Sequence, residues 1–352
     1  MSKPRPIFCH LPLHIKESIV KVADLETKFS IRRCSKQLKK IVDKSPMDYD
    51  KINFDVFSDT QCISIHVHSE GKKLSEKFQD TEDGCFLESK GELMKTGGFM
   101  ELAVEKLMTI LRNHRVSVEH FSLDFHSIGP MNLPSRARYA RQQFTILNLL
   151  EESLSKLNHK LMVCQFGSRG IGREAHRILH FLKPRNLRSL SLKPALWEYP
   201  RDYFVSYGST IDLSQFTELE QWKQAKELEL DYNLDLPVEE TTHFDKASYD
   251  SMGFSVRQAE LIIENMTKNS RKVCVIHCNI STINKNFYPN FHAHFSRVGV
   301  FLVSDYDEED VDWWGERYRR YRVCRNECFI EVACRNWNGR TCIRFERQDP
   351  ER

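Results

Sequence analysis

The sequence lacks the long apolar runs of a membrane protein. Its longest uninterrupted apolar stretches hold about five residues, whereas a helix that crosses a bilayer needs about 20. The opening segment Met1–Pro6 is polar and basic, and the apolar stretch of a secretory signal does not follow it. We therefore expect no membrane partner. We expect the eleven cysteines to be reduced thiols, in the cytoplasm, the nucleus or both.

An excess of charge of one sign is also missing. The 52 lysines and arginines almost balance the 49 acidic residues, which gives a net charge of +3. The segment Trp313–Arg322 mixes aromatic and cationic residues, but the acidic run Asp305–Asp312 directly precedes it and offsets its charge. We therefore predict no nucleic-acid partner and interpret the aromatic residues as contacts for a protein target. These target-binding candidates are Trp313, Trp314, Tyr318 and Tyr321.

Sequence motifs for catalysis or for a cofactor are absent as well. The segment Gly167–Gly172 reads Gly-x-x-Gly-x-Gly, whereas a dinucleotide-binding turn reads Gly-x-Gly-x-x-Gly. We find neither a Gly-Lys-Ser/Thr phosphate loop nor a Gly-x-Ser-x-Gly nucleophile elbow. The segment is therefore interpreted as a glycine-rich turn between a strand and a helix. We expect no cofactor, no catalytic residues and no enzymatic activity, and an enzyme built on the body of the chain is the least favoured class.

The cysteine spacing does not match a structural zinc site. Cys324, Cys328, Cys334 and Cys342 are separated by four, six and eight residues. Zinc-binding cysteines usually come as two pairs, each with its members two to four residues apart. A second group, Cys274 with its neighbours at 277 and 278, lies partly within a predicted strand. We therefore predict no metal site.

Three short helices are predicted near the start of the chain. Asp24 is a candidate cap for the second helix, and Pro46 marks the end of the third. The stripe of the first helix is Leu11, Ile15, Ile19 and Val22, that of the second is Leu25 and Phe29, and that of the third is Cys34, Leu38 and Ile41. Periodicity alone favours a helical cap on a larger domain.

The order of residues in this segment resembles the F-box. The matching residues are Leu11–Ile15, Ile19–Val20, Asp24 and the run Ser30–Lys36. The resemblance implies a three-helix fold that binds the Skp1-type linker, and through it the cullin, of an SCF ubiquitin ligase. The linker-binding residues that it implies are Leu11, Pro12, Ile15, Ile19, Leu25, Ile31, Cys34 and Leu38. Departures from the pattern are Lys16, Ala23, Lys28 and Leu38, the last in place of a frequent Trp.

After Pro46 the sequence predicts two half-buried strands and then alternating helices and strands. The first strands are Tyr49–Phe57 and Cys62–His68, and the charged stretch Glu70–Gly91 after them is predicted as an irregular hairpin or mobile loop. From about Phe99, amphipathic helices alternate with strands centred near 123, 163, 190, 228 and 274. This alternation predicts parallel strands joined by helices. The phrase Leu187-x-x-Leu190-x-Leu192 favours an irregular, leucine-rich-repeat-like α/β solenoid over a doubly wound sheet.

The same part of the chain resembles the FTH domain of nematode proteins. The segment Glu220–Leu228 is similar to the signature of that domain, and Leu150–Leu161 and Ile178–Pro184 are similar to earlier parts of it. Together they cover roughly residues 100 to 280. In nematodes this domain commonly follows an F-box. The strands Cys328–Val332 and Thr341–Phe345 are predicted to pair as a C-terminal β-hairpin cap, because Asn338-Gly339 lies between them.

The sequence therefore predicts an α+β or α/β protein in four parts. They are the F-box at 5–47, connecting strands and a charged loop at 48–98, the FTH-like repeat domain at 99–282 and the cap at 283–352. The predicted function is substrate recognition in an SCF ubiquitin ligase, with the F-box binding the linker and the FTH-like domain binding a target protein. A protein-interaction scaffold with a degenerate F-box and no ligase role is the alternative.

Overall fold

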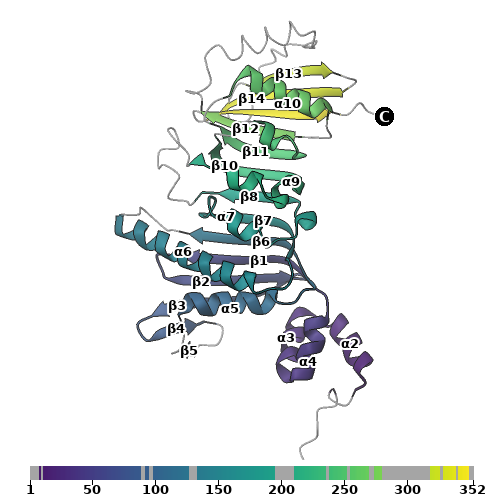
Figure 1. Cartoon of the computed structure of the whole chain (residues 1–352), viewed down its shortest axis with the longest axis vertical. Coiled ribbons are helices and arrows are strands. Elements are labelled where there is room, and N and C mark those ends of the chain that lie inside the picture. Colours follow the sequence, from purple (N-terminus) through teal and green to yellow (C-terminus); the bar gives the residue numbers. More distant parts are fainter. Residues whose placement is uncertain are drawn as a thin grey trace, which may run out of the picture.

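The computed structural model shows a mixed α/β protein with one large sheet and several helices (Figure 1). It describes Phe8 and the ranges 11–88, 92–94, 98–126, 133–194, 210–234, 238–251, 254–268, 273–279, 318–325, 328–337 and 340–348. No helix within these ranges is both long enough and apolar enough to cross a membrane.

Three helices lie at one end of the sheet (Figure 1). They are α2 (Leu13–Val22), α3 (Leu25–Cys34) and α4 (Lys36–Lys44), and we call them the N-terminal module. The predicted cap of α3 is confirmed, because the Asp24 carboxylate accepts a hydrogen bond from the backbone N–H of Thr27. Ser35 caps α4 in the same way, with the backbone N–H of Leu38 as the donor.

The apolar stripe predicted for α2 does not form the buried face of that helix. The buried side chains of α2 are Lys16 and Val20, one turn apart on one side. Ile15 stands one position before Lys16 and so points about 100° away around the helix axis. It is 37% exposed, and Val22 at the end of the stripe is 84% exposed. Ile15 and Val22 of the stripe therefore lie on the outside of the described structure, and Leu11 and Ile19 are half-buried.

The sheet combines a parallel centre with antiparallel ends. In chain order its strands are β1 (Met47–Phe57), β2 (Cys62–Ser69), β3 (Lys72–Thr81), β4 (Gly84–Leu87), β5 (Glu92–Met94), β6 (Val116–His126), β7 (Met162–Arg169), β8 (Ser189–Lys193), β9 (Thr210–Ile211), β10 (Glu227–Leu234), β11 (Lys246–Ser251), β12 (Val273–Asn279), β13 (Tyr318–Arg325), β14 (Cys328–Trp337) and β15 (Arg340–Gln348). Their spatial order is β13-β14-β15-β12-β11-β10-β8-β7-β6-β1-β2-β3-β4-β5, and β9 pairs with β10 beside this path.

The strands from β1 to β12 in that order are parallel, as the alternation of helices and strands predicts. Strands β2 to β5 continue the sheet beyond β1 in antiparallel pairs. At the other end, β15 pairs antiparallel with β12 and with β14. The two C-terminal segments predicted to pair lie in β14 and β15, which are antiparallel neighbours with Val332 opposite Phe345 and Trp337 opposite Arg340.

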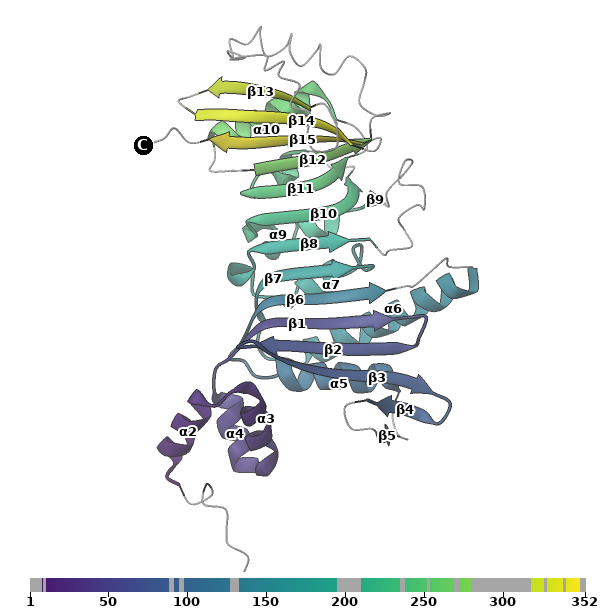
Figure 2. The ribbon, with the colours of Figure 1, turned by 180° about the vertical axis from the view of Figure 1, so that it is seen from behind.

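Among the described residues, the helices of the body cover one face of the sheet and none lies on the other, which we call the open face. They are α5 (Phe99–Leu111), α6 (Leu133–Ser155), α7 (Ala175–Leu179), α8 (Ser214–Thr217), α9 (Glu220–Gln224) and α10 (Val256–Lys268), with short 3₁₀ turns η1 (Pro184–Asn186) and η3 (Val238–Thr241). Figures 1 and 2 view the molecule from opposite sides and place α5, α6, α7, α9 and α10 on the same face. A doubly wound sheet would carry helices on both faces.

Two local predictions for the body need correction. The charged stretch Glu70–Gly91, predicted as an irregular hairpin or a mobile loop, contains the regular strands β3 and β4, which pair antiparallel as a hairpin. These strands are regular because Phe78 is buried beneath α5 while Glu76 pairs with Lys106 of that helix. The apolar pattern along this helix would predict Phe144 on the same inner stripe as Leu147, Leu150 and Leu154, but Phe144 is 62% exposed. The buried side of α6 centres on Leu147 and its neighbours, and Phe144 lies beside that stripe rather than on it.

Candidate protein-binding surfaces

The first candidate surface is the outside of α2. Among the described side chains, four large apolar ones are exposed, namely Leu13, Ile15, Val22 and Phe144. Three of these four belong to α2, a helix of ten residues. At about 100° per residue, Ile15 and Val22 lie within about 20° of each other on one side of α2, whereas Leu13 points to the opposite side. Scattered exposed apolar side chains need no explanation, but two on one side of a short helix, with the half-buried Ile19 between them, are typical of a surface that a partner covers.

The predicted linker-binding residues divide into surface and interior positions. Pro12, Ile15 and Cys34 are exposed, and Leu11, Ile19 and Ile31 are half-buried. Leu38 is only 3% exposed, so it packs inside the N-terminal module and is not open to a partner in this conformation. The side chain of Leu25 lies outside the described residues. Leu13 and Val22 were not among the predicted contacts, although Val22 belongs to the predicted stripe.

One departure from the F-box pattern is accommodated inside the module. Lys16 stands where that family usually has an apolar residue, and it is 4% exposed, on the same buried side of α2 as Val20. A lysine carries four methylene groups that fill apolar space as a short aliphatic side chain does. The module therefore keeps its packing at this position, while the apolar outer side of α2 stays at the surface.

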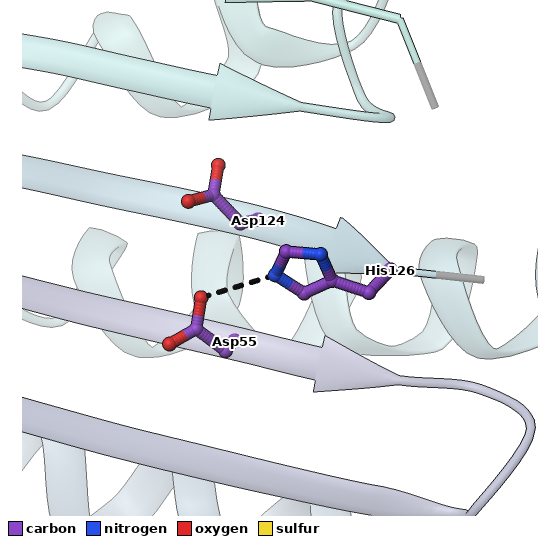
Figure 3. A group of neighbouring side chains, drawn as sticks. All are labelled: Asp55, Asp124 and His126. Carbon is purple, nitrogen blue, oxygen red and sulfur yellow. Dashed lines mark hydrogen bonds and ion pairs between the residues drawn. The ribbon is translucent and has the colours of Figure 1, made fainter. Parts of the chain in front are cut away.

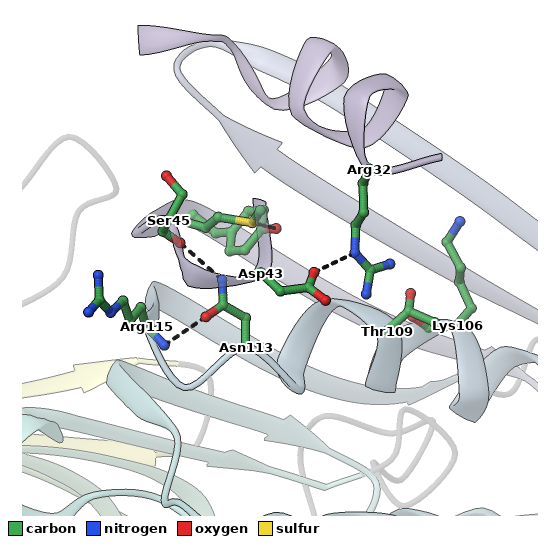
Figure 4. Close-up of polar contacts among 9 residues, drawn as sticks. Arg32, Asp43, Ser45, Lys106, Thr109, Asn113 and Arg115 are labelled. Atoms are coloured by element: carbon green, nitrogen blue, oxygen red, sulfur yellow. Dashed lines mark hydrogen bonds and ion pairs between the residues drawn. The ribbon is translucent and has the colours of Figure 1, made fainter. Parts of the chain in front are cut away.

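Hydrogen bonds from the turn between α5 and β6 join the N-terminal module to the sheet (Figure 4). The amide nitrogen of Asn113 donates to the backbone carbonyl of Ser45 at 3.1 Å, and its Oδ1 accepts from the backbone N–H of Arg115 at 3.0 Å. Arg115 Nη1 donates to the carbonyl of Lys44 at 2.9 Å. These bonds satisfy carbonyl groups at the end of α4, which its own helix leaves without partners.

The second candidate surface is the open face of the sheet, which is polar. On β6, for example, Phe121, Leu123 and Phe125 are buried toward the helices, and the residues between them face the other way. Neighbouring strands are joined there by side-chain hydrogen bonds. Ser122 Oγ donates to Asn53 Oδ1 at 3.0 Å, and further along the sheet the Glu229 carboxylate accepts from Ser191 at 2.6 Å and from Lys193 at 2.8 Å.

Acidic and imidazole side chains meet on this face where β2, β1 and β6 lie side by side (Figure 3). His126 Nε2 lies 3.2 Å from Asp55 Oδ1, and His66 Nε2 lies 3.6 Å from Asp55 Oδ2. Asp124 is directly opposite Asp55 in the strand register. We call Asp55, His66, Asp124 and His126 the Asp–His cluster.

Burial determines the electrostatics of the Asp–His cluster. Burial raises the pKa of Asp124, and the neighbouring Asp55 carboxylate raises it further, against the opposing effect of His126 and Arg169. Burial also lowers the pKa of His66, which Asp55 partly opposes. Two carboxylates thus share a half-buried position in which their charges repel.

No sequence motif marks the Asp–His cluster. Its members stand at positions 55, 66, 124 and 126, so no local motif connects them. The parallel pairing of β1 with β6 places residue 55 opposite residue 124, and the antiparallel pairing of β1 with β2 brings residue 66 alongside. If both strand registers were known, the alternation of side chains along each strand would place these four residues on one face of the sheet.

The glycine-rich segment forms a close-packed turn. Gly170 has a φ of +82°, a conformation that side-chain-bearing residues rarely adopt. A Cβ atom at Gly170 would overlap the hydroxyl of Tyr139, and one at Gly172 would overlap the ring of Tyr232. These glycines therefore allow two tyrosines to pack onto the turn, in agreement with the interpretation of the segment as a turn.

The aromatic target-binding candidates are only partly described. Trp313 and Trp314 lie outside the described residues. Tyr318 and Tyr321 belong to β13, where their backbones pair with Arg335 and Val332 of β14. Their place in a target-binding surface stays a prediction.

Comparison with known families identifies one domain in the chain. The family model of the FTH domain matches residues 144–296. This range begins within α6 and includes the parallel strands β7, β8, β10, β11 and β12. The match overlaps the part of the chain that resembles this domain in sequence, roughly residues 100 to 280, but it starts later and ends later. No curated protein matches the chain.

Proposed function

We propose that this chain is a substrate-recognition adaptor of an SCF-type ubiquitin ligase. In this proposal the N-terminal module is an F-box that binds a Skp1-type linker, and the FTH domain with the rest of the sheet binds a target protein. The observation that carries the proposal is the exposed apolar side of α2 in a chain that also contains an FTH domain. FTH is a family associated with F-box proteins, so its presence supports the F-box interpretation of the three helices.

The apolar side of α2 suits a helix-binding partner. Ile15, Ile19 and Val22 follow the spacing by which a helix places anchors in an apolar groove. Covering a large aliphatic side chain contributes about 1.5–3 kcal/mol when burial is complete, so two or three such anchors support a stable complex. A three-helix module of this size also gains stability from a partner, because it buries little surface on its own.

The open sheet face suits the recognition of a protein target. In a solenoid-like arrangement, with helices on one side only, the exposed strands offer a long surface of polar side chains. Ubiquitin transfer itself belongs to partner enzymes. The adaptor acts by holding the target near them and so raises its effective concentration. The complex would then work in the cytoplasm, the nucleus or both.

A binding measurement with the full chain tests the proposal. A purified Skp1-type linker is titrated against the wild type, against a variant carrying Ile15→Ala and Val22→Ala, and against one carrying Leu11→Ala and Pro12→Ala. We expect the wild type to bind and each double variant to bind at least about tenfold more weakly, because each loses apolar contact area. Phe144→Ala removes an equally exposed apolar side chain from α6 and should leave the affinity unchanged.

Two outcomes would contradict the adaptor role. One is a wild-type chain that does not bind the linker, and the other is equal binding by the wild type and both double variants. If the wild-type chain does not bind the linker but does bind a target protein, the result would favour the alternative, an interaction scaffold with a degenerate F-box. Such a loss would be assigned to Ala23 and Lys28, which depart from the family pattern and are half-buried, whereas Lys16 is inside the module.

A further inference from the structure

We propose that the Asp–His cluster is a binding site for one divalent transition-metal ion of the zinc type, held by Asp55, His66, Asp124 and His126. This inference does not rest on the adaptor role. It concerns the open face of the sheet, where three neighbouring strands each contribute metal-ligating side chains.

The spacing of the donor atoms fits an ion. Zinc lies about 2.0–2.1 Å from imidazole nitrogen and about 2.0–2.2 Å from carboxylate oxygen, so the donors of a tetrahedral site stand about 3.3 Å apart. His126 Nε2 and His66 Nε2 already approach the Asp55 carboxylate at 3.2 and 3.6 Å. One donor atom each from Asp55, Asp124 and His126 lies within 4.8 Å of the others. Small side-chain rotations bring them to the required spacing.

The orientation of the two imidazole rings is fixed by neighbouring side chains. Ser75 Oγ lies 2.9 Å from His66 Nδ1, which leaves Nε2 of that ring directed at the cluster. Metal-bound histidines usually make such a hydrogen bond through their second ring nitrogen. The ring of His126 stacks on Phe57, with 4.8 Å between ring centroids and 16° between ring planes. Each ring thus directs Nε2 at the Asp55 carboxylate, His126 toward Oδ1 and His66 toward Oδ2.

The charge of the Asp–His cluster also favours a cation. Asp55 and Asp124 are paired across β1 and β6, and the side chain of Asp55 is only 12% exposed. Arg169 acts on Asp124, and Lys51 and Lys73 act on His66, so some positive charge is already near the edges of the site. A divalent ion between the carboxylates would offset their mutual repulsion directly.

The set of donors selects the class of ion. Two imidazole nitrogens and two carboxylate oxygens suit zinc, cobalt, manganese or iron, whereas magnesium and calcium prefer oxygen ligands alone. Four protein ligands would leave a tetrahedral ion without an open position, which is typical of a structural site. An ion held in this way would connect β2, β1 and β6.

Cobalt provides a spectroscopic probe that separates this site from the eleven cysteines. The full chain is freed of metal with a chelator, its thiols are kept reduced, and Co²⁺ is added in steps, with Zn²⁺ as the competitor. We expect one equivalent to bind with a ligand-field spectrum that lacks thiolate charge-transfer absorption, and to be displaced by Zn²⁺. Saturating Zn²⁺ should also raise the melting temperature, because the ion binds the folded state.

Matched variants locate the ion. Asp55→Asn and His126→Gln should each weaken Co²⁺ binding at least about tenfold, as the loss of a metal ligand requires. His120→Gln changes a histidine on the same strand that interacts with Gln165 and should leave the affinity unchanged. If Asp55→Asn fails to fold, His66→Gln provides the second test.

Three results would overturn the proposal. They are no saturable binding by the wild type, equal binding by the wild type and the His126→Gln and His66→Gln variants, and a thiolate charge-transfer band that shows the ion at cysteines. None of them affects the linker-binding experiment, so failure of the metal site and failure of the adaptor role remain distinguishable.

Discussion

The N-terminal module and the sheet place their apolar side chains in opposite ways. In the sheet, apolar residues point toward the helices and the open face is polar, as on β6. In the module, α2 buries Lys16 and Val20 and exposes Ile15 and Val22. A large sheet covered by helices can bury its apolar side chains alone, whereas three short helices cannot. The module therefore needs another surface to cover its exposed apolar side chains, whereas the sheet buries its own apolar side chains against its helices.

The largest effect is expected from a cavity in the sheet core. Trp222 is 1% exposed, and its ring packs edge-on against Phe244 with 5.0 Å between ring centroids. Trp222→Ala should lower the free energy of unfolding of the body by about 3–5 kcal/mol. Chemical denaturation followed by circular dichroism measures this change. Phe144→Ala, an exposed position, should change it by less than about 0.5 kcal/mol, and a comparable loss at both positions would contradict the described core.

A smaller effect is expected at the glycine-rich turn. Gly172→Ala places a methyl group against the ring of Tyr232 and should destabilise the sheet by about 1–3 kcal/mol. Gly167→Ala is the control, because the nearest atoms to its added Cβ lie 3.7 Å away, an ordinary contact distance. Equal melting temperatures for the two variants would show that Tyr232 does not pack on this turn.

A third prediction concerns the hydrogen bonds that attach the N-terminal module to the sheet. Asn113→Ala removes the donor to the Ser45 carbonyl and leaves buried polar groups without that partner, at a cost of about 1–3 kcal/mol. Hydrogen exchange should quicken in α4 and around Ser45 more than in the central strands. Asn158→Ala is the matched control, since this asparagine is exposed and its side chain interacts with the adjacent His159. Uniform protection in both variants would show that this bond does not join the two regions.

The smallest effect concerns charge on the open face. The raised pKa of Asp124 means that its charged form is less favourable in the folded chain than in the unfolded one, so this residue reduces stability increasingly as pH rises through its folded pKa. In metal-free protein, Asp124→Asn should therefore raise the melting temperature slightly at neutral pH. The gain should disappear as pH falls to the ordinary aspartate pKa of 3.8, where the wild-type carboxyl is protonated in the folded state. A lower melting temperature for the variant at neutral pH would contradict this account.

Local sequence patterns predicted much of the architecture. Asp24 caps α3 as expected, and the parallel strands follow the predicted alternation with helices. Strand β11 was missed, because Lys246–Ser251 is short and only Ala247 and Tyr249 supply an apolar pattern. The charged residues around Phe78 concealed β3, since their partners on α5 and the neighbouring strands lie far away in sequence.

The candidate surfaces were less predictable than the elements that carry them. The apolar stripe of α2 is visible in the sequence, but periodicity does not tell whether such a stripe faces a core or a partner. Ile15 and Lys16 are neighbours in the chain, and only tertiary packing decides which of them is buried. The Asp–His cluster depends on strand registers between residues about 70 positions apart, which no local pattern encodes.

The order of the strands has a consequence for synthesis of the chain. From β1 to β12 each parallel strand is laid beside an earlier one, so this part of the sheet can grow as the chain emerges from the ribosome. Strand β12 obtains its outer neighbour, β15, only from residues 340–348. Until those residues are synthesised, the backbone groups on this edge of β12 lack β15 as a partner and can form hydrogen bonds with strands of other chains. A chain that stops before residue 340 would keep that edge open and should be prone to aggregation.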